Sequence, residues 1–216
     1  MPRSALAKTI VEAVKRGLAP PLREIGFRKT GTNFYQLTSE SNKLVHIQSS
    51  QWNSASLSRF TIELGIYFPS IDGLMDQQFT RKGTLPWSPK IFNCQLRRRI
   101  GLLLPINRDF WWEVTPATDA NHLATELAQA WQSYGAPWMN RNSNLGAAVL
   151  DLEAQSLYWV AAAGRLSMGE REQASRLARA FIESFTKQAA HPANAELIEK
   201  HLTNIHRWCA THKIKL

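Results

Sequence analysis

Polar and aromatic side chains gather where a predicted strand ends and a loop begins. Gln48, Ser50 and Trp52 follow one another closely there. Amide and hydroxyl groups beside an exposed indole are suited to binding the edge of a ligand. In the alternative interpretation, Gln48 and the nearby His46 satisfy backbone groups inside the sheet. The stretch is therefore a candidate binding site with a structural alternative.

Three consecutive arginines, Arg97, Arg98 and Arg99, form the second candidate site and fall in another predicted strand. Side chains alternate along a strand, so one guanidinium must face away from the other two. An arginine fork suits a carboxylate or a phosphate. The alternative is an edge strand or a cross-strand ion pair that holds the sheet together. Acidic residues of the expected neighbouring strands are the candidate partners: Glu63, Asp109 and Glu113.

A pair of indoles, Trp111 and Trp112, completes the set of candidate binding residues. Neighbouring strand residues point to opposite faces, so we expect one indole in the core and one exposed or under a helix. Exposed aromatic rings among arginines are able to stack nucleic-acid bases. No nucleic-acid-binding motif accompanies them, so core packing is the expectation for most of the 8 tryptophans.

Metal chemistry and nucleophilic catalysis find little support in the sequence. His206, Cys209 and His212 lie on a predicted helix, but the third residue is turned by about 120° from the first. No fourth ligand is in register and no zinc motif is present, so we expect no metal or cofactor. His46 has no serine or cysteine placed by a motif as its partner. We therefore name no catalytic residue, and an unrecognised enzyme is the second alternative function.

Strict alternation of apolar residues predicts a half-buried antiparallel strand over residues 60–68. One face carries the apolar residues and is expected to be core: Phe60, Ile62, Leu64, Ile66 and Phe68. Further strands are expected at residues 33–38, 44–48, 94–104 and 109–115. These strands account for a sheet of about five members.

Segments with helical periodicity lie before and after this strand-rich region. The first helix is expected from Ser4 to Gly17, with Gly17 as its stop and Pro20-Pro21 barring continuation. Later helices are expected at residues 122–134, 144–156, 157–166, 170–186 and 194–213. Strands followed by helices predict an α+β fold, an antiparallel sheet with packed helices and a helical C-terminal extension. The expected domains are residues 1–135 and a helical extension, residues 136–216, packed on them.

Positive charge is concentrated in the strand-rich half of the chain. The formal net charge is +9 at pH 7. Through Thr115 there are 16 Lys and Arg against 8 Asp and Glu, a net of +8, whereas the remainder has 10 against 9, a net of +1. This distribution favours an acidic partner or nucleic acid. The alternative is a solvated basic surface without a dedicated partner.

Cysteine usage and hydropathy indicate the compartment. Cys94 and Cys209 are far apart in sequence, and the amino-terminal residues are spaced for an amphipathic helix rather than a signal peptide. We therefore expect free thiols and a cytoplasmic protein. No apolar stretch approaches the roughly 20 residues needed to span a bilayer, so no membrane association is expected.

The order of short motifs resembles a bacterial family known as domain of unknown function 4304. The motifs are LREIGFRKTGTNFYQL, VHIQSSQWN, RFTIELGIYFP, LRRRIGLLLP and DFWWEV, in this order over roughly the first 135 residues. Residues that carry the resemblance are Gly26, Phe27, Phe34, Ile47, Gln48, Ser50, Phe60, Thr61, Gly65, Arg99, Ile100, Gly101, Trp111 and Trp112. The resemblance implies a fold and a bacterial source. It implies no activity, and it does not cover the helical tail.

These observations together predict a noncatalytic binding protein. The expected partner is an acidic protein, engaged through a basic surface that carries aromatic residues, as toxin-blocking immunity proteins do by analogy. The first alternative is a nucleic-acid-binding accessory protein. The identity of the partner and the oligomeric state do not follow from the sequence.

Overall fold

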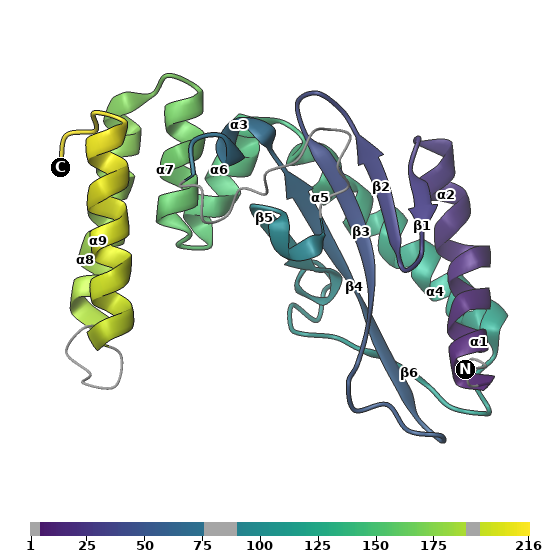
Figure 1. Cartoon of the computed structure of the whole chain (residues 1–216). Coiled ribbons are helices and arrows are strands. Elements are labelled where there is room, and N and C mark those ends of the chain that lie inside the picture. The colour runs from purple at the N-terminus through teal and green to yellow at the C-terminus, as the bar shows by residue number, and fades with distance from the viewer. Residues whose placement is uncertain (1–4, 76–89, 189–194) are drawn as a thin grey trace. The chain divides into compact units, whose positions relative to one another are not determined.

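A computed structural model describes residues 5–75, 90–188 and 195–216 of the chain (Figure 1). The chain forms two compact units. The first unit comprises residues 1–67 and 86–143, and the second comprises residues 68–85 and 144–216. The predicted division after residue 135 differs from these limits, because residues 136–143 belong to the first unit and residues 68–85 to the second.

The first unit is built on an antiparallel sheet of six strands. In chain order these are β1 (Arg28–Thr30), β2 (Asn33–Leu37), β3 (Asn42–Ser49), β4 (Ser58–Tyr67), β5 (Leu96–Arg99) and β6 (Trp112–Val114). Strands β1 to β5 are neighbours in this order, and β6 pairs with β4. Strand β4 therefore pairs with β3 on one side and, on the other, with β6 near its start and β5 near its end. The prediction of an α+β fold is confirmed.

The apolar face of β4 lies in the core, as the alternation predicts. Phe60, Ile62, Leu64, Ile66 and Phe68 are all at most 1% exposed. Helices cover the sheet in this unit: α1 (Ala5–Ala13) packs against α4 (Ala120–Ala130), and α4 lies behind the strands in Figure 1. Removing this apolar surface from water is the main stabilising term for the unit.

The first helical run continues through Gly17, so the prediction that the helix stops there is wrong. Helix α1 passes into a π-helical turn, η1 (Val14–Leu18), and then into α2 (Ala19–Glu24). Gly17 serves for close approach instead, because a Cβ there would overlap the carbonyl oxygen of Ala124 in α4. Pro20 and Pro21 fall in the first turn of α2, where a missing N–H costs little. Ser4, the expected first residue, lies outside the described residues.

A second π-helical turn interrupts the run that begins with α4. This turn, η4 (Trp131–Gly135), precedes α5 (Ala136–Arg141), which has proline in its first turn. In both turns the next alanine donates its backbone N–H to the residue five positions earlier, Ala19 to Val14 and Ala136 to Trp131. The wide turn carries the helix into a proline-containing segment without ending it.

The prediction of a long strand over residues 94–104 is wrong beyond Arg99. Strand β5 ends there and a 3-10 turn, η3 (Ile100–Leu102), follows. A Cβ at Gly101 would lie 2.5 Å from the carbonyl oxygen of Arg108 and 2.6 Å from the Cβ of Phe110. The chain bends at this glycine so that residues 108–110 can pack against it. The short 3-10 turn η2 (Ile91–Asn93) precedes β5.

The second unit is helical. It contains α3 (Pro69–Asp72), α6 (Leu145–Ala154), α7 (Tyr158–Ser167), α8 (Arg171–Gln188) and α9 (Ala195–Thr211). Small side chains line the contact of α7 with α8, where Ala161, Ala162 and Ala174 are fully buried. Small residues at these positions let the two helix backbones approach closely.

Both cysteines are free, as predicted, and both are buried. Burial raises the pKa of the Cys94 thiol to about 12 and that of the Cys209 thiol to about 11. Both groups are therefore neutral and weakly nucleophilic at physiological pH. Within the described residues, no helix has the length and apolar character to cross a membrane.

Candidate binding surface on the open face of the sheet

The sheet face opposite the apolar face of β4 is here called the open face. On β4 it carries Thr61 and Glu63, which alternate with the buried core residues. Thr61 lies opposite Gln48 of β3, and Glu63 lies opposite Arg99 of β5. Residues that are directly opposite in an antiparallel pair share a face, so all four project from the open face. Arg97, two residues before Arg99, projects there as well.

Arg99 is the centre of a hydrogen-bonded cluster on this face. Its Nη1 donates to Oδ2 of Asp109 at 2.6 Å, and its Nη2 donates to Oε1 of Gln48 at 3.3 Å. The guanidinium carbon lies 5.2 Å from the ring centroid of Trp111, within cation–π range. The indole Nε1 of Trp111 donates to the same Oδ2 of Asp109 at 3.1 Å. Three predicted site residues, Gln48, Arg99 and Trp111, are therefore brought together, and Asp109 joins them.

The hydroxyl of Thr61 lies beneath this cluster without a hydrogen-bond partner. Arg99 begins opposite Glu63 on one side of β4, and its Nη2 ends at Gln48 on the other side, opposite Thr61. The guanidinium therefore crosses β4 above Thr61, whose side chain is fully buried. The Thr61 Oγ1 atom is inaccessible to solvent and unpaired. Buried polar groups are rarely left unpaired, so this hydroxyl calls for an explanation.

Arg98 projects from the opposite face to Arg97 and Arg99, as strand alternation predicts. Arg98 lies opposite Leu64, so it projects to the core face and is half-buried. Arg97 is exposed on the open face. The neighbouring pair on this face is Arg59 with Glu113, whose Nε and Oε1 atoms are 2.8 Å apart. Of the three carboxylates proposed as partners, Asp109 pairs with Arg99 and Glu113 pairs with Arg59.

The two indoles divide between the faces, as predicted. Trp112 is 5% exposed and stacks on Phe60 with ring centroids 5.5 Å apart, so it belongs to the core. The Phe110 and Trp112 rings are nearly perpendicular, with their centroids 5.0 Å apart. Trp111 is half-buried on the open face and supports Arg99. Trp112 is therefore a structural residue, and Trp111 stays a candidate for binding.

Ser50 and Trp52 lie in the loop between β3 and β4. The Ser50 hydroxyl accepts a hydrogen bond from the Trp52 backbone N–H at 3.1 Å, and Asn53 Oδ1 accepts one from the Arg59 backbone N–H at 2.6 Å. These bonds shape the loop, so Ser50 has a structural role here. The Trp52 side chain is 81% exposed, an unusual exposure for an indole. Trp52 is therefore the most accessible aromatic residue among the predicted site residues.

A broad cleft of about 800 Å³ opens beside this surface, between residues 108–113 and the start of α4. Trp111 and Trp112 contribute to its lining, together with Phe110. Its charged lining is mainly acidic, with Asp109, Glu113, Asp119 and Glu126 against Arg108. Each of these carboxylates already has a contact. Asp109 contacts Arg99, and Glu113 contacts Arg59. Asp119 accepts a hydrogen bond from the backbone N–H of Asn121, and Glu126 contacts His122.

His46 occupies the same face of β3 as Gln48. Its Nδ1 lies 2.6 Å from Oδ1 of Asn33. An amide oxygen only accepts, so Nδ1 carries the hydrogen and donates a hydrogen bond to Asn33. Burial lowers the pKa of His46, and the nearby Glu63 carboxylate partly offsets this shift. The imidazole is therefore neutral at physiological pH and held by Asn33. This geometry favours the structural interpretation of His46.

The excess positive charge lies elsewhere in the first unit. The charged groups around the Arg99 cluster balance: Arg59, Arg97 and Arg99 against Glu63, Asp109 and Glu113. By contrast, residues 8–29 contain six basic and two acidic residues, and all six basic side chains are exposed. This segment, here called the basic edge, runs through α1, η1 and α2 to the edge strand β1. The sequence pattern did not separate the basic edge from the arginine–tryptophan cluster.

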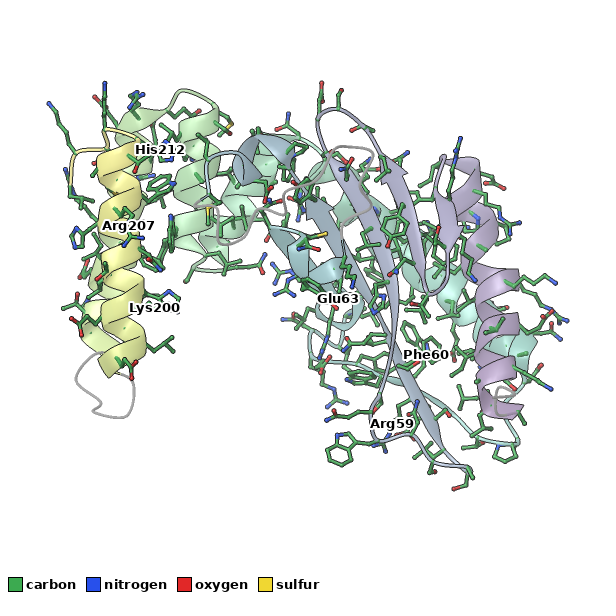
Figure 2. The ribbon with its side chains drawn as sticks, in the orientation of Figure 1. Arg59, Phe60, Glu63, Lys200, Arg207 and His212 are labelled. Atoms are coloured by element: carbon green, nitrogen blue, oxygen red, sulfur yellow. The ribbon has the colours of Figure 1, made fainter. Side chains whose placement is uncertain are left out.

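Metal binding has no support in residues 5–75, 90–188 and 195–216, where no group of three or more His, Cys, Asp or Glu side chains is placed to hold an ion. His206, Cys209 and His212 illustrate this on α9. Cys209 is buried, and a ring nitrogen of His212 lies 3.0 Å from the carbonyl oxygen of Leu74 (Figure 2 labels His212). The chemistry that the open face offers is recognition of an anionic group by a stacked guanidinium.

Fold and surface together define an α+β domain with one helix-covered sheet face and an opposite face that carries the Arg99 cluster, followed by a helical unit. The chain belongs to the family described as "Domain of unknown function (DUF4304)", whose model matches residues 18–141. The predicted resemblance is thereby confirmed, and helices α6 to α9 lie beyond the match. No curated protein and no solved structure matches the chain.

Proposed function

We propose that the protein is a noncatalytic binding protein whose partner is an acidic protein. The observation that carries this proposal is the 81% exposure of Trp52, in the loop that joins β3 and β4, the strands that contribute Gln48 and Thr61 to the open face. Exposed aromatic residues next to arginines are typical of the residues that dominate binding energy in protein interfaces. The same residue types recur at Arg99 and Trp111 on the open face.

The basic edge supplies the second part of the proposal. Its uncompensated charge would attract an acidic surface over about 10 Å at moderate salt and raise the rate of association. The charges around the Arg99 cluster balance, so contact there depends on shape and hydrogen bonding. Bacterial source and cytoplasmic location belong to this proposal, supported by the family resemblance and by the free, buried cysteines.

Affinity capture with matched variants tests the function. Arg28→Glu combined with Lys29→Glu reverses two exposed charges on β1, and Lys200→Glu combined with Arg207→Glu reverses two on α9 (the last two are labelled in Figure 2). Both double variants change the net charge equally. The β1 variant and Trp52→Ala are expected to lose an acidic partner that the α9 variant retains.

Nuclease treatment separates the first alternative from the proposal. Capture of an acidic protein should survive nuclease, whereas loss of all captured material would support a nucleic-acid-binding accessory protein. Equal retention by the β1, α9 and Trp52 variants would refute the proposed surface. Turnover of a captured small molecule or peptide would instead favour the second alternative, an enzyme.

A further inference from the structure

We propose that the Arg99 cluster is a carboxylate-binding subsite in which Asp109 holds the place of a partner's carboxylate. This inference rests on the proposed function and names the chemical group that the partner presents. The group is the side chain of an aspartate or glutamate. It would replace Asp109 on the guanidinium of Arg99 and leave Asp109 to the solvent.

The first argument is the geometry of the guanidinium. Trp111 lies against Arg99, and Gln48 accepts from its Nη2, so the planar group is oriented before any ligand arrives. Preorientation reduces the freedom that is lost on binding. Asp109 contacts Nη1 through one oxygen, Oδ2, which also accepts from the indole of Trp111. The site therefore already accommodates one carboxylate oxygen between two donors.

The second argument is the unpaired hydroxyl below the guanidinium. Thr61 Oγ1 is buried and has no partner, on the same face as Gln48 and Arg99. An oxygen that enters between Gln48 and Arg99 would give this hydroxyl an acceptor. A donor left unpaired in the free protein and satisfied in the complex contributes to selectivity for a ligand oxygen.

The third argument concerns the charge of the ligand. Glu63 lies opposite Arg99, and Asp109 is in contact with it, so two carboxylates already surround one guanidinium. A phosphate group, which carries more negative charge, would be repelled more strongly than a carboxylate. Exchange of Asp109 for another carboxylate preserves the ion pair. Because the Asp109 side chain is 50% exposed, its return to water costs little.

The test uses the isolated, full-length protein and sodium acetate as the probe. Acetate is titrated against sodium chloride at constant ionic strength and neutral pH, and the indole N–H signals are followed by ¹H–¹⁵N NMR. The signal of Trp111 is assigned with Trp111→Phe. We expect a saturable shift of this signal, because the indole loses its hydrogen bond to Asp109. A shift that is absent, or that stays linear, would overturn the proposal.

Four variants sharpen the test. Arg99→Gln should abolish saturation, whereas Arg97→Gln, with the same charge change on the same face, should not. Asp109→Asn should tighten acetate binding about two- to fivefold, because the competing carboxylate is gone. Thr61→Val should weaken it about two- to tenfold, the worth of one hydrogen bond. Equal loss in the Arg97 and Arg99 variants would show attraction by net charge only and refute the subsite.

Two further measurements keep the outcome unambiguous. Arg99→Lys keeps the charge and removes the fork, so it replaces Arg99→Gln if that variant does not fold, and it should also prevent saturation. Inorganic phosphate at matched ionic strength should shift the Trp111 signal less than acetate. A stronger response to phosphate would overturn the choice of a carboxylate.

Failure of this inference is distinguishable from failure of the proposed function. Saturable acetate binding without capture of any acidic protein removes the function and leaves the subsite. Capture of an acidic protein that is equal for the wild type and Arg99→Gln removes the subsite and leaves the function.

Discussion

Replacing Thr61 with valine should stabilise the protein, although polar-to-apolar changes on a sheet face are often neutral. Threonine and valine are both β-branched, so strand propensity and side-chain rotamer preference change little. The substitution puts a methyl group where the Thr61 hydroxyl lies, beneath Arg99 and beside Gln48. Only the unpaired oxygen is removed.

The magnitude follows from the state of that hydroxyl. Thr61 Oγ1 has no accessible surface and no hydrogen-bond partner. An unsatisfied buried polar group costs about 1–3 kcal/mol, and its removal recovers part of this cost. We therefore expect Thr61→Val to raise the free energy of unfolding by about 1 kcal/mol. This corresponds to an increase of about 0.5 M in the urea midpoint at a typical m-value.

Urea denaturation followed by circular dichroism measures this change, and Thr38→Val is the matched control. The Thr38 hydroxyl donates to the Ser41 carbonyl at 2.6 Å and accepts from the Ser41 N–H at 3.0 Å. The same substitution should lower stability there by about 1 kcal/mol. Destabilisation by Thr61→Val would refute the reasoning, since it would mean that the Thr61 hydroxyl has a partner in solution.

Three further predictions concern the framework around the open face. Leu64→Ala, in the apolar face of β4, should lower the free energy of unfolding by about 2–5 kcal/mol in a urea titration, and an unchanged midpoint would contradict the assigned register. Gly17→Ala should lower it by about 3 kcal/mol, because the new Cβ would overlap the Ala124 carbonyl oxygen, whose carbon would lie 2.6 Å away. The matched change Gly73→Ala meets nothing nearer than 3.5 Å and should be nearly neutral by the same assay. Burial lowers the pKa of His46, so the unfolded chain binds a proton more readily than the folded protein, and the free energy of unfolding should fall as pH drops below about 6.5. His46→Gln should remove this part of the pH dependence. An unaltered pH profile in that variant would contradict the assignment.

Local alternation carried much of the fold prediction. Phe60 to Phe68 repeat at period two over enough residues that a half-buried strand was the only regular structure that fits. The same rule separated Arg98 from its neighbours and Trp112 from Trp111, because alternation depends only on the strand being present. Helices α7 to α9 were predictable for a similar reason, since each has its own apolar period.

Pairing between distant segments was not predictable in this way. The meeting of Gln48 and Arg99 depends on the register of β3 on β4 and of β4 on β5, which no short stretch encodes. The buried state of Thr61 depends on where the Arg99 side chain ends, and so on the same two registers. Strand β1 was missed because Arg28–Thr30 is short, fully exposed and without an apolar period. The signal that would have found it is Gly31, at φ 60°, in a two-residue hairpin connection.

The two π-helical turns, η1 and η4, bear on how the sequences of this family should be aligned. A π turn holds one residue more than an α-helical turn, so deleting one residue from Val14–Leu18 would restore a regular helix rather than break it. Because the wide turn accommodates the extra residue, side chains after the deletion would keep their positions around the helix axis. Ala19 and Leu22, both buried, would stay in the core. Relatives that lack a residue here are therefore expected to carry their apolar positions one step displaced, and an aligner that penalises such a gap would misplace every residue up to β1.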